Sequence, residues 1–176
     1  MTVLKTRQVA PKLSVPTLNG SWSLENQNPE HFTMIVFYRG LHCPLCQKYL
    51  AELDANLEQF TEAGVSVIAI SSDNQNRTEL TVESAKINNL EMGYDLTVEQ
   101  AQQWGLHRSA GRGKTSIGIE EPDEFSEPGL FLVKPDGTLY WSNISTMPFA
   151  RPNFKEILGA IKFVLANDYP ARGELV

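Results

Sequence analysis

The sequence has few cysteines, few basic residues and no long apolar run. Only two cysteines occur in 176 residues, whereas a secreted disulfide scaffold carries several dispersed ones. Fifteen Lys and Arg face twenty-one Asp and Glu, so the net charge is −6 and no basic nucleic-acid-binding surface is expected. No apolar run approaches the ~20 residues that span a bilayer. We therefore expect neither a nucleic-acid partner nor a membrane partner.

The rest of the composition is that of an ordinary globular protein. The hydrophobic fraction is 41% and the charged fraction 20%. This length favours one domain over residues 1–176. Residues 1–20 contain two prolines and lack the apolar core of a signal peptide, so a cytoplasmic location is expected.

The first half of the chain predicts strands that alternate with helices. Short β-rich apolar runs over Thr33–Tyr38 and Val65–Ile70 are typical of buried strands. After Pro44, apolar residues recur at helical spacing, and Gly64 is expected to end this helix. A more polar helix is expected over 76–88.

The second half predicts a short helix, an inserted loop, a hairpin and a final helix. Thr97 and Gln100 form a candidate capping box at the start of the short helix. Residues 107–127 are expected to be a loop, basic at first and then acidic. The segments 130–133 and 138–141 flank a Pro-Asp-Gly turn and form the hairpin.

The final helix is amphipathic, and Asn153 with Glu156 is a second candidate capping box. Alternating strands and helices predict an α/β fold with βαβ units on a parallel sheet, and the late hairpin adds an antiparallel edge. The expected result is a central mixed sheet flanked by helices, with an N-terminal extension and an insertion at 107–127.

Both cysteines fall in one C-x-x-C, four residues after a buried strand and at the start of a helix. Cys43 is the expected N-cap and Cys46 lies one turn further on. Unpaired backbone N–H groups and the helix dipole stabilise a thiolate at this position. Residues three apart on a helix face each other, so one sulfur can attack a substrate and the other can resolve the product. Such a cycle needs neither a metal nor an organic cofactor.

Structural thiols and a zinc half-site are the alternatives for this pair. Buried structural thiols are common and inert. Zinc requires four nitrogen or sulfur ligands, and the three histidines show no paired ligand spacing.

Three neighbours of the pair are candidate site residues. Arg39 is a fixed positive charge that could stabilise a thiolate or orient a peroxide oxygen. His42 could raise thiolate character when protonated, or relay a proton. Pro128, before the late hairpin strand, is a candidate cis proline facing the site. The alternative is that Arg39 and His42 are simply exposed loop residues.

The segment Phe37–Cys46 (FYRGLHCPLC) resembles the active-site segment of peroxiredoxin-like proteins of the AhpC/TSA family. Ala10-Pro11 and the segment 131–137 (FLVKPDG) resemble the opening and the late hairpin of that family. The resemblance implies a thioredoxin fold and thiol-dependent reduction of hydroperoxides. It places Cys46 at the peroxidatic position and implies a thioredoxin- or glutathione-type reductant and a possible homodimer.

The segment also departs from the family pattern. Cys43, Arg39 and Pro128 stand where typical members carry Thr, Pro and Arg, and those three residues bind and polarise the peroxide. Cys43, Cys46 and Pro128 instead match thioredoxin, in which the first cysteine is the nucleophile. Three functions therefore stay open, namely a peroxidase attacking through Cys46, a protein-disulfide oxidoreductase attacking through Cys43, and a redox-sensing binding module.

Overall fold

The chain alternates strands and helices over residues 3–175, which the computed structural model describes. The elements follow one another in this order: β1 (Ser14–Thr17), β2 (Gly20–Ser23), the 3-10 helix η1 (Leu24–Asn26), β3 (Phe32–Phe37), α1 (Pro44–Ala55), α2 (Leu57–Glu62), β4 (Val65–Ile70), α3 (Gln75–Ala85), β5 (Glu91–Gly93), α4 (Val98–Gln103), β6 (Arg108–Ala110), β7 (Glu124–Ser126), β8 (Gly129–Val133), β9 (Leu139–Ile144) and α5 (Phe154–Asn167). The expected strands at 33–38 and 65–70 are thus confirmed to within a residue.

Seven strands form one mixed sheet in the order β2-β1-β5-β4-β3-β8-β9. At its centre, β3 runs parallel to β4 and antiparallel to β8, so Ile35 pairs with Ile68 and with Phe131. The predicted hairpin is β8–β9, and it supplies the antiparallel edge. The predicted mixed sheet flanked by helices is confirmed.

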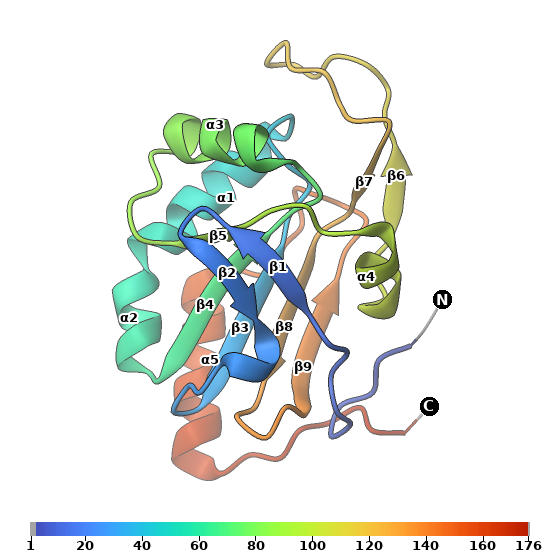
Figure 1. Cartoon of the computed structure of the whole chain (residues 1–176). Coiled ribbons are helices and arrows are strands. Elements are labelled where there is room, and N and C mark those ends of the chain that lie inside the picture. The colour runs from blue at the N-terminus through green and yellow to red at the C-terminus, as the bar shows by residue number, and fades with distance from the viewer. Residues whose placement is uncertain (1–2, 176) are drawn as a thin grey trace.

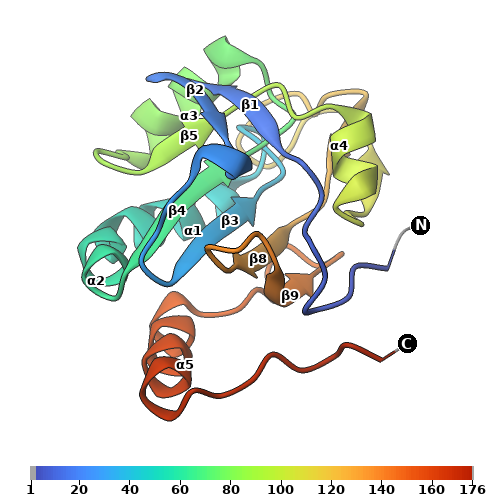
Figure 2. The same ribbon diagram turned by 60° about the horizontal axis from the view of Figure 1, so that its bottom comes forward.

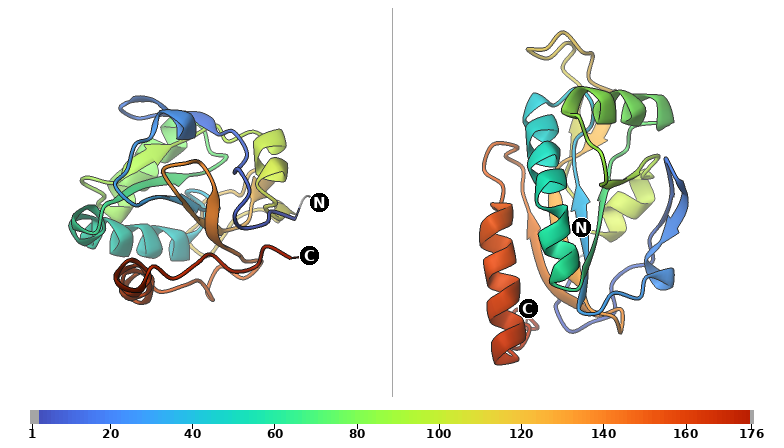
Figure 3. Two further views of the ribbon diagram at one scale, coloured as in Figure 1. Left: turned by 90° about the horizontal axis from the view of Figure 1, so that it is seen from below. Right: turned by 90° about the vertical axis from the view of Figure 1, so that its left-hand side faces the viewer.

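Helices cover both faces of this sheet (Figures 1 and 3). On one face, α1, α2 and α5 bury apolar side chains against β3, and the segment after α3 joins the same cluster. On the other face, α4 and the N-terminal segment pack against β3, β4 and β8. Every residue of β3 is buried, which explains its unbroken apolar run.

The helix expected after Pro44 is divided into α1 and α2 at Asn56. The Asn56 side-chain amide donates to the Glu52 carbonyl at 2.7 Å, and the Asn56 backbone N–H turns to Leu53 instead. This side-chain competition ends the regular ladder of α1. Gly64, which was expected to end this helix, follows α2 and has φ +70°.

The structure adds strands where the sequence predicts none. The N-terminal extension contains the antiparallel pair β1–β2, and β1 joins the main sheet through β5. The expected loop 107–127 is in fact a second, two-stranded sheet, β6–β7, with an excursion between its strands. Figure 1 shows this segment rising above the end of the main sheet at which β3 and β4 terminate.

The two ends of the described chain lie side by side (Figure 2). The Thr6 hydroxyl donates to the Arg172 carbonyl and the Arg7 Nε–H to the Ala171 carbonyl, both at 3.0 Å. The predicted single domain 1–176 reaches beyond the described residues at both ends and stays a prediction.

Candidate active site

The cysteine pair lies at the N-terminus of α1, directly after β3. Cys43 is the N-cap, as predicted, and its sulfur accepts the Cys46 backbone N–H at 3.2 Å. Pro44 takes the first helical position, where its missing N–H costs nothing. Both sulfurs are free thiols in residues 3–175, and the two side chains are buried.

The two thiols differ in the charge state that their surroundings favour. The pKa of Cys43 is lowered to about 7, first by a hydrogen bond from the Cys46 side chain and then by the Cys46 backbone N–H, Arg151 and Arg39, against the effect of burial. Burial raises the pKa of Cys46 well above its ordinary value, and its hydrogen bond to Cys43 raises it further. Of the two sulfurs, Cys43 is therefore the one whose thiolate is favoured.

The loop between β3 and α1 is anchored by the buried carboxylate of Asp73. Asp73 accepts the Leu41 backbone N–H at 2.7 Å and the Arg77 Nε–H at 2.8 Å. Gly40 has φ +132°, and a Cβ at this position would lie 2.5 Å from Asp73 Oδ2. Asp73 therefore sets the path of the chain into Cys43. Sequence reasoning missed it, although its place just after β4 was a usable signal.

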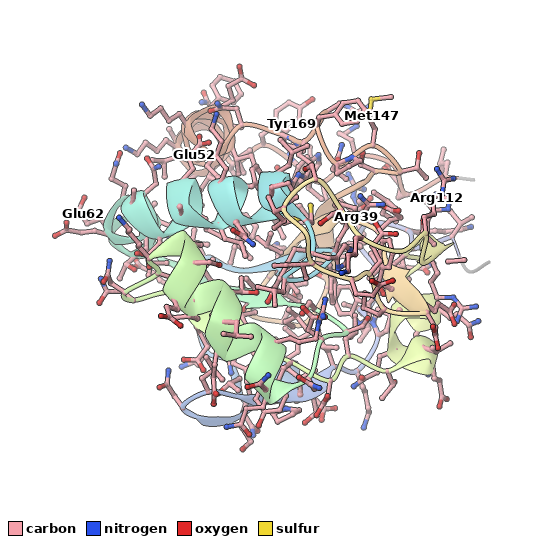
Figure 4. All side chains as sticks on the ribbon, turned by 90° about the horizontal axis from the view of Figure 1, so that it is seen from above. Arg39, Glu52, Glu62, Arg112, Met147 and Tyr169 are labelled. Atoms are coloured by element: carbon pink, nitrogen blue, oxygen red, sulfur yellow. The ribbon has the colours of Figure 1, made fainter. Side chains whose placement is uncertain are left out.

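Arg39 is tied to the 107–127 segment. Its guanidinium forms an ion pair with Glu127 at 3.0 Å and lies 4.7 Å from the centre of the Phe125 ring. Glu127 is buried and also accepts the Ser109 hydroxyl. Figure 4 looks down on this end of the sheet. In that view Arg39 lies nearer the middle of the molecule than Arg112 and Met147 do.

His42 is buried rather than exposed. Its ring packs on Phe125 with centroids 4.5 Å apart, and neither ring nitrogen has a hydrogen-bond partner within residues 3–175. Burial lowers the pKa of His42 to about 4, against the raising effects of Asp73 and Glu121. The ring is therefore neutral at pH 7 and supplies no positive charge to Cys43.

Arg151 is the site residue that the sequence did not reveal. It lies in the loop between β9 and α5, and its Nη1 is 3.5 Å from Cys46 Sγ. Its guanidinium sits over the Tyr49 ring at 4.2 Å, and its Nε–H donates to the Pro148 carbonyl at 2.7 Å. It lies 105 residues from Cys46 in the chain, and no local motif marks it.

Pro128 lies on the Arg151 side of the site. It lines a small recess beside Tyr49, Leu130 and Arg151. The peptide bonds within residues 3–175 are all trans, so Pro128 does not present the cis geometry for which it was a candidate.

Neither a metal centre nor a membrane span is found in residues 3–175. No three His, Cys, Asp or Glu side chains there are grouped to hold a metal ion. No helix in the same range is long and apolar enough to cross a bilayer.

A mixed sheet with a dithiol at the N-terminus of the helix that follows β3 is the arrangement of a thiol-active protein of the thioredoxin fold. The family model described as "AhpC/TSA family" matches residues 6–142, and the chain belongs to this family. The curated protein "Peroxiredoxin Bcp" of Escherichia coli K12 is 28% identical over 141 residues, which are 79% of this chain and 85% of that protein.

Solved structures share the fold. Peroxidoxin BcpB of Mycobacterium tuberculosis superimposes with a TM-score of 0.71 at 18% identity, covering 92% of this chain and 99% of that one. A peroxiredoxin-like protein of Aquifex aeolicus gives a TM-score of 0.67 at 20% identity, covering 93% of this chain and 90% of that one. The predicted family and the thioredoxin fold are thereby confirmed.

Proposed function

We propose that this protein is a thiol-dependent peroxidase that reduces hydroperoxides through a Cys43–Cys46 dithiol/disulfide cycle. Membership of the AhpC/TSA family and the likeness to a curated peroxiredoxin support peroxide as the oxidant. The observation that carries the proposal is the pair itself, with one sulfur stabilised as a thiolate at a helix N-terminus and a second thiol beside it.

The charges of the pair favour Cys43 as the sulfur that attacks. The reactive form of cysteine is the thiolate, and Cys43 is the sulfur whose thiolate is favoured. The Cys43 thiolate attacks the peroxide O–O bond, takes one oxygen to become a sulfenic acid, and releases an alcohol or water. The Cys46 thiol then displaces the hydroxyl as water and forms the disulfide. The family resemblance predicts the opposite order, with Cys46 attacking first.

A dithiol reductant completes the cycle by returning two electrons and two protons to the disulfide. A thioredoxin- or glutathione-type thiol is proposed for this step. The cytoplasmic location and the homodimer stay predictions.

Protein-disulfide exchange is the second candidate function. It is favoured by the lowered pKa of Cys43, because an N-cap thiolate paired with an inner thiol can also attack a disulfide. In that reaction Cys43 forms a mixed disulfide and Cys46 releases it.

Stopped-flow oxidation of the reduced protein by hydrogen peroxide tests both candidates. Wild type, Cys43→Ser and Cys46→Ser are followed by Trp fluorescence, and mass spectrometry locates the sulfenic acid. We expect a reaction orders of magnitude faster than that of a simple thiol, retained in Cys46→Ser and lost in Cys43→Ser. The reverse pattern would make Cys46 the attacking residue. If all three proteins react like a simple thiol, the peroxidase proposal fails, and trapping of a mixed disulfide on Cys43 becomes the test of exchange.

A further inference from the structure

The positive charge that contacts a sulfur of the pair is directed at Cys46, not at Cys43. Arg151 Nη1 approaches Cys46 Sγ to 3.5 Å, whereas the Arg39 guanidinium faces Glu127 and Phe125. The ion pair with Glu127 offsets the charge of Arg39. Arg151 makes none of the salt bridges found within residues 3–175, so its full charge acts on its surroundings.

The Arg151 guanidinium is held in place by contacts that do not neutralise it. The Tyr49 ring lies beneath it at 4.2 Å, and the Pro148 carbonyl accepts its Nε–H at 2.7 Å. Tyr49 in turn donates its hydroxyl to the Pro152 carbonyl at 2.6 Å, which ties α1 to the loop that carries Arg151. The loop and the helix therefore fix the guanidinium over one sulfur.

Cys46 is the sulfur that most needs such a charge. It must lose its proton to displace the hydroxyl from a sulfenic acid on Cys43, yet its side chain is fully buried. Burial disfavours any thiolate there, and the charge of Arg151 is the largest influence that opposes this rise in the pKa of Cys46.

We propose that Arg151 is a catalytic residue of the second step, in which it stabilises the Cys46 thiolate while the S–S bond forms and the S–O bond of the Cys43 sulfenic acid breaks. The hydroxyl leaves with the proton of Cys46 as water. This role rests on the proposed function and on Cys43 attacking first.

The first test separates the two steps in a single turnover. Arg151→Gln and the charge-matched control Lys155→Gln, an exposed residue at the start of α5, are oxidised with one equivalent of hydrogen peroxide. A dimedone-type trap quantifies the sulfenic acid, and mass spectrometry quantifies the disulfide. For Arg151→Gln we expect disulfide formation slower by about tenfold or more, and a smaller loss in the oxidation of Cys43, whose pKa Arg151 also lowers. Lys155→Gln should match wild type in both steps.

Arg151→Lys is the conservative variant. It keeps a charge but loses the planar group that stacks on Tyr49, so we expect it to restore part of the disulfide rate. An unchanged disulfide rate in Arg151→Gln, or one that falls no more than the rate of the first step, would overturn the proposal.

The second test does not depend on peroxide. Thiolate absorbance is titrated in Cys43→Ser and in Cys43→Ser with Arg151→Gln, so that Cys46 is the sulfur observed in both. We expect the pKa of Cys46 to be higher without Arg151, and equal pKa values would overturn the proposal. If peroxide oxidation is slow in every variant but this shift is present, the proposed function fails while the link between Arg151 and Cys46 stands.

Discussion

The two sulfurs lie three positions apart on one helix turn, yet their surroundings favour opposite charge states. Both belong to the apolar cluster, but Cys43 is the N-cap of α1 and follows a polar side of the site, where Arg39, Glu127 and the ring of His42 pack under the 107–127 segment. Cys46 meets the apolar core and a single guanidinium from the loop before α5. A C-x-x-C motif alone would treat the two sulfurs as equivalent. The structure separates them because the helix terminus and the core act on different positions of the motif.

The polar side of the site thus depends on a buried charge network, whereas the surroundings of Cys46 depend on burial and one cation. Substitutions can disturb one side at a time.

The largest effect is expected from Glu127→Ala, which removes the buried partner of Arg39. Breaking a buried ion pair leaves the remaining charge uncompensated, so the free energy of unfolding should fall by about 3 kcal/mol. Urea unfolding measures the loss. Glu124→Ala is the control, because its pair with Arg108 is exposed and should contribute about 1 kcal/mol or less. Equal losses in the two variants would show that the Arg39–Glu127 pair has no special role.

His42 should make the stability depend on pH. Its pKa is lowered from 6.5 to about 4, with Arg39 and Arg77 adding to the effect of burial. Between these values the unfolded chain binds a proton that the folded chain does not. The contribution of His42 is therefore complete above pH 6.5 and falls by about 3 kcal/mol as the pH drops toward 4. Urea unfolding at a series of pH values should show a flatter slope in His42→Phe. The same slope in both proteins would contradict a buried neutral ring.

Gly40→Ala tests the loop that leads into Cys43. The added Cβ meets Asp73 at 2.5 Å in a backbone conformation with φ +132°, so we expect a loss of about 2 kcal/mol and a slower reaction of Cys43. Gly20→Ala is a matched control, because Gly20 has φ +138° but nothing within 4 Å of an added Cβ. Thermal unfolding should place the Gly20 variant between Gly40→Ala and wild type.

The smallest effect concerns the hydrogen bond between the two sulfurs. Cys46→Ala removes the side chain that chiefly lowers the pKa of Cys43 to about 7. We expect this pKa to rise by about one unit, or ~1.4 kcal/mol, when the rate of iodoacetamide alkylation is measured against pH. Cys46→Ser keeps a hydrogen-bond donor and should give a smaller rise. A value near 7 in both variants would indicate that the helix terminus alone sets the pKa of Cys43.

Much of the fold could be predicted, because its signals are local. The apolar run of β3 and the Thr97–Gln100 capping box of α4 were recognisable and are confirmed. Asn153 is the N-cap of α5, although Glu156 does not return the hydrogen bond of a full capping box within the described residues. The short strands β1, β5 and β6 were missed, because they depend on pairing with distant partners rather than on their own pattern.

The candidate site could be predicted only in part, because some of its residues come from segments distant in the chain. The positions of Cys43, Arg39 and His42 follow from their closeness to β3. Arg151 and Glu127 reach them from other elements through contacts that no spacing in the sequence encodes.

The sequence by itself determined a C-x-x-C at the start of a helix, because the strand, the proline and the helical spacing are all local properties of this segment. Only the tertiary structure decided that a thiolate on Cys46 is disfavoured, because burial raises the pKa of that sulfur, whereas the hydrogen bonds that favour a thiolate on Cys43 come from the same helix turn. The tertiary structure placed Cys46 in the core beneath Arg151, and Cys43 at the helix terminus beside a neutral His42.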